Sequence, residues 1–166
     1  YDGNVVETDW DDYKRLMSVN LDGAFYVGSV FGKKMIQQDS GSFVFLSSFA
    51  GLRGEAGAAA YCASKFGLIG FVESFAAEMT SHNIRVNAIS PGNVDSPMLK
   101  NVAELIARRN NSSTAKVYNE MRTSGAAKRL VLPSEVANLA VYLSSELSNG
   151  ITGSIVKIDC GAGVDG

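Results

Sequence analysis

The sequence predicts an α/β fold in which a buried parallel sheet carries helices on both faces. A short apolar run at 43–46 is bounded by small polar residues, which is typical of a strand buried on both sides, and a second strand is predicted at 84–89. Residues 58–81 between them have a long helical pattern, and strand, helix and strand in this order build a parallel sheet. A further apolar segment at 151–158 predicts a third strand.

A long helix is predicted ahead of the first strand, over residues 9–38. Its start resembles a capping box at Thr8 to Asp11, with Asp11 in place of the usual glutamate. Apolar residues then recur at spacings of three and four, which predicts that they share one buried face: Tyr13, Met17, Ala24, Val27 and Phe31. The amide of Asn20 falls on the same face, where a purely structural helix would carry leucine or alanine.

The pattern weakens after the second strand. Residues 93–127 are polar with one or two short helical segments, and a stretch this long inside a compact domain is usually functional. A last helix is predicted at 133–144, beginning with a proline. Because three strands alone leave the first one with an unpaired apolar edge, we expect further N-terminal strands that this chain lacks.

Composition narrows the class of protein. The 166 residues predict a single domain, 1–166, with 46% hydrophobic and 19% charged residues, as in a compact folded enzyme. A net charge of −2 argues against nucleic acid as a partner, and no apolar run approaches the ~18 residues of a membrane span. Cys62 and Cys160 have no metal-ligand spacing, so no metal site is expected. A cytoplasmic location is the expectation.

The chemistry-bearing residues gather around the strand that ends near residue 47. Tyr61 and Lys65 lie one helical turn apart, and Ser48 ends the preceding strand, where open α/β sheets bind ligands. A free tyrosine has a pKa of about 10, and a nearby cation favours the phenolate. We therefore expect Lys65 to lower the pKa of Tyr61 for acid–base catalysis. Ser48 would hold the substrate oxygen, and Asn20 would anchor a water that links Lys65 to solvent.

Plainer interpretations stay open at this point. A tyrosine and a lysine four positions apart occur by chance in many helices, and a buried Asn20 needs only a backbone carbonyl as its partner. A nucleophilic role for Ser48 is the weaker alternative. The only histidine is His82, in a polar stretch after the long helix, and no Ser-His-Asp set can be assembled around it.

The order of motifs resembles the short-chain dehydrogenase/reductase family over nearly the whole chain. Each motif is weak alone, and together they are specific. They are Val19-Asn20-Leu21-x-Gly23-x-Phe25, Ser47-Ser48, Tyr61-x-x-x-Lys65, Arg85-Val86-Asn87-x-Ile89-x-Pro91-Gly92 and Ile151-Thr152-Gly153. The resemblance implies the catalytic, C-terminal part of a doubly wound, Rossmann-like sheet. It also implies an oxidoreductase that interconverts a small alcohol and a carbonyl compound.

The resemblance also implies the roles of single residues. Tyr61 would be the general acid/base in a catalytic tetrad with Asn20, Ser48 and Lys65. The cofactor, NAD or NADP, would be held by Tyr61, Lys65, Pro91, Gly92, Val94 and Ser96. Val94 would offer backbone groups to the nicotinamide carboxamide, and Ser96 stands where the family more often has threonine. Residues 97–127 would form the substrate lid, so the substrate itself cannot be named.

One expected motif is absent, the glycine-rich turn that receives the dinucleotide pyrophosphate at a helix N-terminus. This leaves a second hypothesis, in which the chain is a non-catalytic fragment or family member that serves folding or oligomerisation. Helices 9–38 and 58–81 resemble those that pair subunits in this family, so a homodimer or homotetramer is expected through them. The intact tetrad favours the enzyme.

Overall fold

The structure is a computed structural model that describes residues 3–164, so the ends of the predicted 1–166 domain lie outside the described residues. Its three parallel strands are β1 (Gly41–Leu46), β2 (Ile84–Pro91) and β3 (Ile155–Ile158), in the order β1-β2-β3. The longer helices are α1 (Trp10–Met17), α2 (Gly23–Gln38), α3 (Ala59–Met79), α4 (Pro97–Arg109), α5 (Thr114–Thr123) and α6 (Pro133–Ser144).

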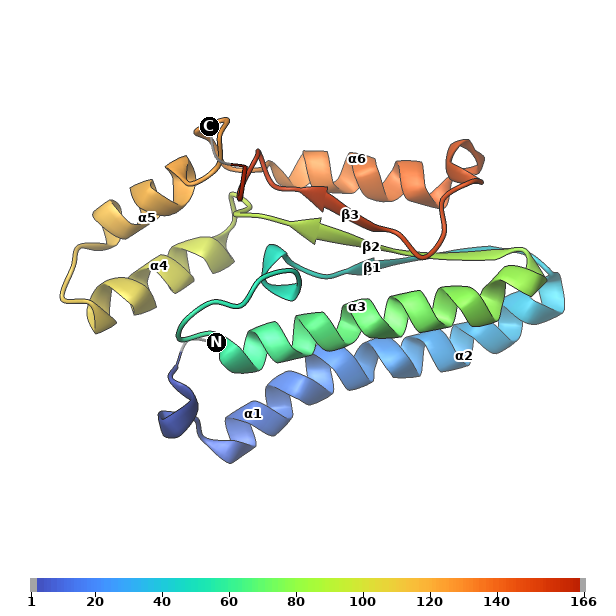
Figure 1. The fold of residues 1–166 in the computed structure, drawn as a ribbon, viewed down its shortest axis with the longest axis horizontal. Coiled ribbons are helices and arrows are strands. Elements are labelled where there is room, and N and C mark those ends of the chain that lie inside the picture. The colour runs from blue at the N-terminus through green and yellow to red at the C-terminus, as the bar shows by residue number, and fades with distance from the viewer. Residues whose placement is uncertain (1–2, 165–166) are drawn as a thin grey trace.

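The helices lie in layers on the two faces of the sheet. Figure 1 shows α2 and α3 on one side of the strands and α6 on the other. The main core lies between α3 and the sheet, where Val72, Val86 and Ala88 are fully buried. β1 and β2 pair in register from Gly41 with Ile84 to Leu46 with Ile89. The predicted α/β class, with a parallel sheet and helices on both faces, is confirmed.

The predicted 9–38 helix is continuous but not uniform. Asp9 caps α1, because its side chain accepts the backbone N–H groups of Asp11 and Asp12. A π-helical segment, Ser18–Asp22, then separates α1 from α2. Such single-turn bulges often occur at functional sites, and this one contains Asn20.

The predicted buried face of this helix is wrong for its C-terminal half. Val27 and Phe31 are 46% and 52% exposed. The buried positions of α2 are Gly28 and Gly32, next to the ring of Phe75 on α3. Two glycines let α3 approach closely, so the contact surface of α2 lies about one residue away from the face that the apolar side chains mark.

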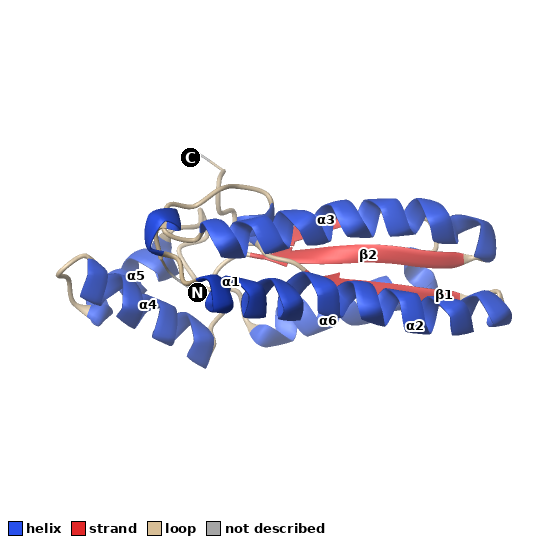
Figure 2. Cartoon of the chain, turned by 90° about the horizontal axis from the view of Figure 1, so that it is seen from below, coloured by secondary structure: helices blue, strands red, loops and turns tan. Residues whose placement is uncertain are grey.

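The third strand is shorter than predicted, because Gly153 has a positive φ of 67° and interrupts the extended backbone. Residues 151–154 are still bonded to β2, through backbone groups and through a side chain. The buried amide of Asn87 donates to the Ile151 carbonyl at 2.8 Å and accepts the Ser154 N–H at 3.0 Å. Residues 97–127 form α4 and α5, which pack on each other around Ala103, Ala107 and Val117. Figure 2 shows this pair extending beyond one end of the sheet. Within residues 3–164, no helix has the length and apolarity needed to cross a bilayer.

Candidate active site

The candidate site lies where β1 and β2 end side by side. Ser48 follows β1 by two residues, and Tyr61 and Lys65 lie on the first two turns of α3. The loop after β1 contacts α3 directly, since a Cβ added to Gly51 would lie 2.8 Å from the Lys65 carbonyl oxygen. The Ser47 hydroxyl donates to the same carbonyl at 3.3 Å. Only a glycine at residue 51 permits this approach, and it brings Ser48 close to the start of α3.

The phenol of Tyr61 is half-buried, and its pKa is raised above the ordinary value. Burial is the main cause, because it disfavours the charged phenolate. A hydrogen bond with the Ser48 side chain lowers the pKa, and the Glu55 carboxylate raises it. The expectation that Lys65 brings the pKa of Tyr61 down is therefore wrong for this structure. The raised pKa keeps the phenol protonated.

The position of Lys65 explains this result. Its ammonium lies over the face of the Tyr61 ring, 5.7 Å from the centroid, and donates to the Leu46 carbonyl at 3.0 Å. The Ser47 N–H donates to the Ile89 carbonyl on β2. Because successive residues of a strand direct their backbone groups to opposite edges, the Leu46 carbonyl points away from β2, toward the outer edge of β1. Burial lowers the pKa of Lys65. An ammonium has three N–H donors, and only this one bond is found within residues 3–164.

Asn20 has a partner that sequence analysis did not identify. Its amide donates to the Ser64 hydroxyl at 3.1 Å, and that hydroxyl donates to the Tyr61 carbonyl at 2.7 Å. Ser64 is fully buried on α3, between the predicted catalytic tyrosine and lysine. A serine in an otherwise apolar buried helix needs partners, and this requirement was the available signal. The chain of bonds ties the π-helical segment to the first turns of α3.

The predicted cofactor residues follow β2. Pro91 ends the strand, and the Gly92 N–H donates to the Ile158 carbonyl at 3.0 Å. A Cβ at Gly92 would lie 3.0 Å from the Cα of Asp159, so a side chain has little room there. Ser96 caps α4, because its hydroxyl accepts the Leu99 N–H at 3.3 Å.

Val94 forms an isolated parallel bridge with Val131. Both bonds belong to Val131, whose N–H donates to the Asn93 carbonyl and whose carbonyl accepts the Asp95 N–H, each at 2.9 Å. In a parallel bridge of this kind, the N–H and C=O groups of the opposite residue point away from the partner. Those of Val94 have no hydrogen-bond partner in the described part of the chain.

The donor set fits the nicotinamide half of a dinucleotide. A carboxamide needs one acceptor and one or two donors, which the backbone of Val94 and its surroundings can meet. The spare N–H groups of Lys65 fit ribose hydroxyls. Within residues 3–164, no group of three or more His, Cys, Asp or Glu side chains is placed to hold a metal ion. The roles of the tetrad and of the cofactor residues stay predictions.

Known proteins with similar sequences match almost the full chain. Residues 1–163 match the family profile described as enoyl-(acyl carrier protein) reductase. The 3-oxoacyl-(acyl-carrier-protein) reductase of Thermotoga maritima is 35% identical over 161 residues, which cover 95% of this chain and 58% of that protein. The enzyme of the same name from Aquifex aeolicus is 36% identical over 150 residues, covering 90% of this chain and 56% of its own length.

Solved structures give the same result for the fold. NAD+-bound xylitol dehydrogenase has a TM-score of 0.91 at 31% identity, over 95% of this chain and 62% of that one. Levodione reductase has a TM-score of 0.90 at 28% identity, over 96% and 60%. The Rossmann-like sheet is thereby confirmed. The chain spans less than two thirds of the length of each of these four relatives. It belongs to the short-chain dehydrogenase/reductase family, as the order of its motifs predicts.

Proposed function

We propose that the complete protein is an oxidoreductase that interconverts an alcohol and a carbonyl compound with NAD or NADP. The observation that carries this proposal is the position of the Lys65 ammonium over the ring of the half-buried Tyr61, 5.7 Å from its centroid. Among the relatives, xylitol dehydrogenase is NAD+-bound and 4-hydroxyisoleucine dehydrogenase is complexed with NADH. A small alcohol or ketone is the proposed substrate class.

Each residue of the tetrad has a physical task in this proposal. A bound nicotinamide would supply or accept the hydride. Ser48 holds the substrate oxygen, and the Tyr61 hydroxyl gives it a proton during carbonyl reduction. The raised pKa of Tyr61 suits this direction, because the phenol stays protonated near neutral pH. Lys65 orients the ribose, and Asn20 holds the π-helical segment against α3 through Ser64.

The substitution Tyr61→Phe tests the proposal in the complete protein. It removes the hydroxyl and keeps the ring under Lys65, so turnover should fall about a thousandfold while cofactor affinity stays nearly unchanged. Steady-state kinetics and a titration with NAD and NADP measure the two effects. Tyr142→Phe on α6 is the matched control and should behave as wild type. A Tyr61→Phe variant with retained activity would exclude the acid–base assignment.

A second candidate role is self-association, and the exposed apolar face of α2 favours it. Phe25, Tyr26 and Val30 are 60%, 68% and 65% exposed, which is unusual for large apolar side chains gathered on one helix. A groove between α2 and α3 runs past the glycines of both helices. We propose that a second copy of the chain covers this face, in a dimer or a tetramer.

A further inference from the structure

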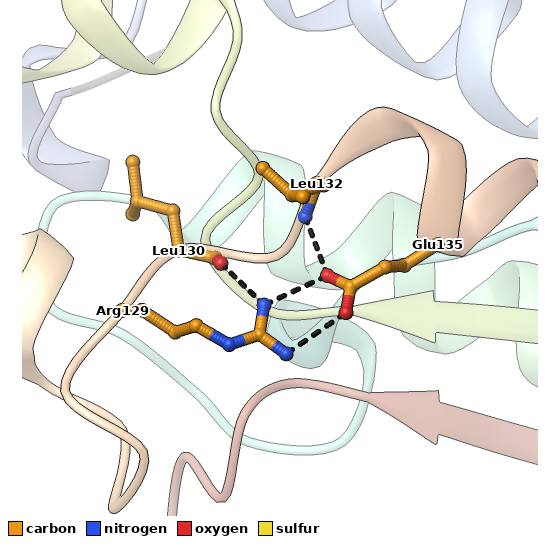
Figure 3. Close-up of polar contacts among 4 residues, drawn as sticks. All are labelled: Arg129, Leu130, Leu132 and Glu135. Carbon is orange, nitrogen blue, oxygen red and sulfur yellow. Dashed lines mark hydrogen bonds and ion pairs between the residues drawn. The ribbon is translucent and has the colours of Figure 1, made fainter.

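An ion pair outside the predicted site encloses one short segment of backbone. The Arg129 guanidinium donates to both Glu135 carboxylate oxygens at 2.8 Å and to the Leu130 carbonyl at 3.0 Å. Glu135 also accepts the Leu132 N–H at 2.8 Å. Figure 3 shows the two side chains bracketing residues 130–132 from either end. The pair lowers the pKa of Glu135 to about 2, so the carboxylate stays charged in any ordinary buffer.

The residue inside this bracket is Val131, which is 1% exposed. Its two backbone bonds to Asn93 and Asp95 position the segment after β2 and turn the free backbone groups of Val94 away from Val131. The path of residues 130–132 therefore sets the direction of the Val94 N–H and C=O. The Arg129–Glu135 pair fixes this path at both ends.

Capping of α6 does not require Arg129. Glu135 satisfies the Leu132 N–H by itself, and Pro133 at the start of α6 has no N–H to satisfy. The Arg129 side chain is half-exposed, and exposed ion pairs add little to stability. What the planar guanidinium adds is geometry: two parallel bonds to one carboxylate and a third to a carbonyl. A lysine has its three donors on a single nitrogen, so it could not make the two parallel bonds to the carboxylate.

The same segment is linked to the predicted lid. The Asn93 amide donates to the Met121 carbonyl at 2.9 Å, and the Tyr118 hydroxyl donates to the Asp95 carboxylate at 3.1 Å. The partners in these two bonds, Met121 and Tyr118, lie on α5, whereas Val131 lies in the loop before α6. The segment 93–95 is thus held from two sides, and the Val131 side is anchored by the Arg129–Glu135 ion pair.

We propose that Arg129 and Glu135 are positioning residues that aim the backbone of Val94 at the nicotinamide carboxamide. This inference rests on the proposed oxidoreductase function. Neither side chain is assigned a contact with substrate or cofactor; both act through Val131. Without the two parallel Arg129–Glu135 bonds, residues 130–132 can shift. The hydrogen bonds of Val131 to Asn93 and Asp95 then lengthen, and the backbone N–H and C=O of Val94 lose their alignment.

The test compares Arg129→Lys and Arg129→Gln with Arg108→Gln in the complete protein. Arg108 is the matched control, since it forms an exposed ion pair with Glu104 on α4, away from residues 93–95. Amide hydrogen exchange of the cofactor-free protein follows the Asp95 and Val131 N–H groups, and fluorescence titration gives the Kd for NAD and NADP. Steady-state kinetics at varied cofactor and saturating substrate separates kcat from the cofactor KM.

In both Arg129 variants the amide hydrogens of Asp95 and Val131 should exchange with solvent faster than in wild type. Both variants should bind the cofactor roughly three- to thirtyfold more weakly. Their kcat should stay near that of wild type, because Tyr61 and Lys65 lie on α3. Arg108→Gln should change neither quantity. Full rescue by lysine, or unchanged exchange with unchanged Kd, would overturn the positioning role. Wild-type protein that binds neither NAD nor NADP would instead overturn the proposed function on which it rests.

Discussion

At the scale of single residues, the protonation state of Tyr61 depends on what surrounds the phenol. Burial raises its pKa, the Ser48 hydroxyl lowers it, and the Glu55 carboxylate raises it. The Lys65 ammonium lies over the face of the Tyr61 ring and donates a hydrogen bond to the Leu46 carbonyl. The Glu55 carboxylate is the one of these groups that can be altered without removing a tetrad member.

Glu55→Gln should lower the pKa of Tyr61, because a neighbouring negative charge disfavours the phenolate. In alcohol oxidation the phenolate is the base, so the rate rises as pH climbs through this pKa. The rise should occur at lower pH in the variant than in wild type. The pH dependence of kcat/KM measures the shift. Glu73→Gln, an exposed change on α3, should leave the profile in place, and equal profiles for Glu55→Gln and wild type would contradict the prediction.

At the scale of elements, the loop from β1 to α3 decides how Ser48 meets Tyr61. The short helical turn Phe49–Gly51 packs on α3, and its last residue faces the Lys65 carbonyl. The contact is between two backbones, so neither side can move away by a rotamer change. Ser48 stabilises the turn from its start, since its hydroxyl accepts the Ala50 N–H at 3.2 Å.

Gly51→Ala should therefore force this loop away from α3. The added methyl would lie 2.8 Å from both the Lys65 carbonyl oxygen and the Ser47 hydroxyl oxygen. We expect a loss of about 1–3 kcal/mol in the free energy of unfolding, together with reduced turnover. Gly54→Ala in the same loop is the control, because no atom of the described residues lies within 4 Å of its added methyl. Urea unfolding that ranks the two variants equally would disprove the close contact.

At the scale of the whole molecule, the surface around α2 exposes more apolar side chains than the surface of an ordinary monomer does. Its large apolar side chains point outward, while glycines make the contact with α3. The outer edge of β1 has no strand partner within residues 3–164, and Leu46 at the end of this strand is 56% exposed. Exposed surfaces of this kind are normally covered by further protein.

Val30→Glu should weaken self-association without disturbing the fold. Val30 is 65% exposed, so a charge is tolerated in the monomer but would be buried and unpaired in the proposed interface. We expect the dissociation constant to rise at least about tenfold. Sedimentation equilibrium measures it, with Lys100→Glu on the exposed surface of α4 as the control, which should leave the constant unchanged. A wild-type protein that is monomeric at all concentrations would contradict the proposal.

The sequence alone was enough for the order of strands and helices. The apolar run 43–46 indicates a strand buried on both faces, because helices cover both faces of a parallel sheet. The motif around Tyr61 and Lys65 is equally local, since a helix places residues four apart on one face. The short helical segments predicted within residues 93–127 are α4 and α5. The predicted third strand was too long because Gly153, at a positive φ of 67°, interrupts the extended backbone.

Only the tertiary structure decided how these elements meet. Asn20 and Ser64 are 44 positions apart, and the bridge between Val94 and Val131 joins two segments with no shared periodicity. Gly28 and Gly32 shift the contact surface of α2 by about one residue from the expected face, because an absent side chain can mark the closest contact as well as an apolar one does. The pKa of Tyr61 is raised mainly because the phenol is buried. Periodicity reports local geometry, whereas these features depend on backbone approach and desolvation between distant segments.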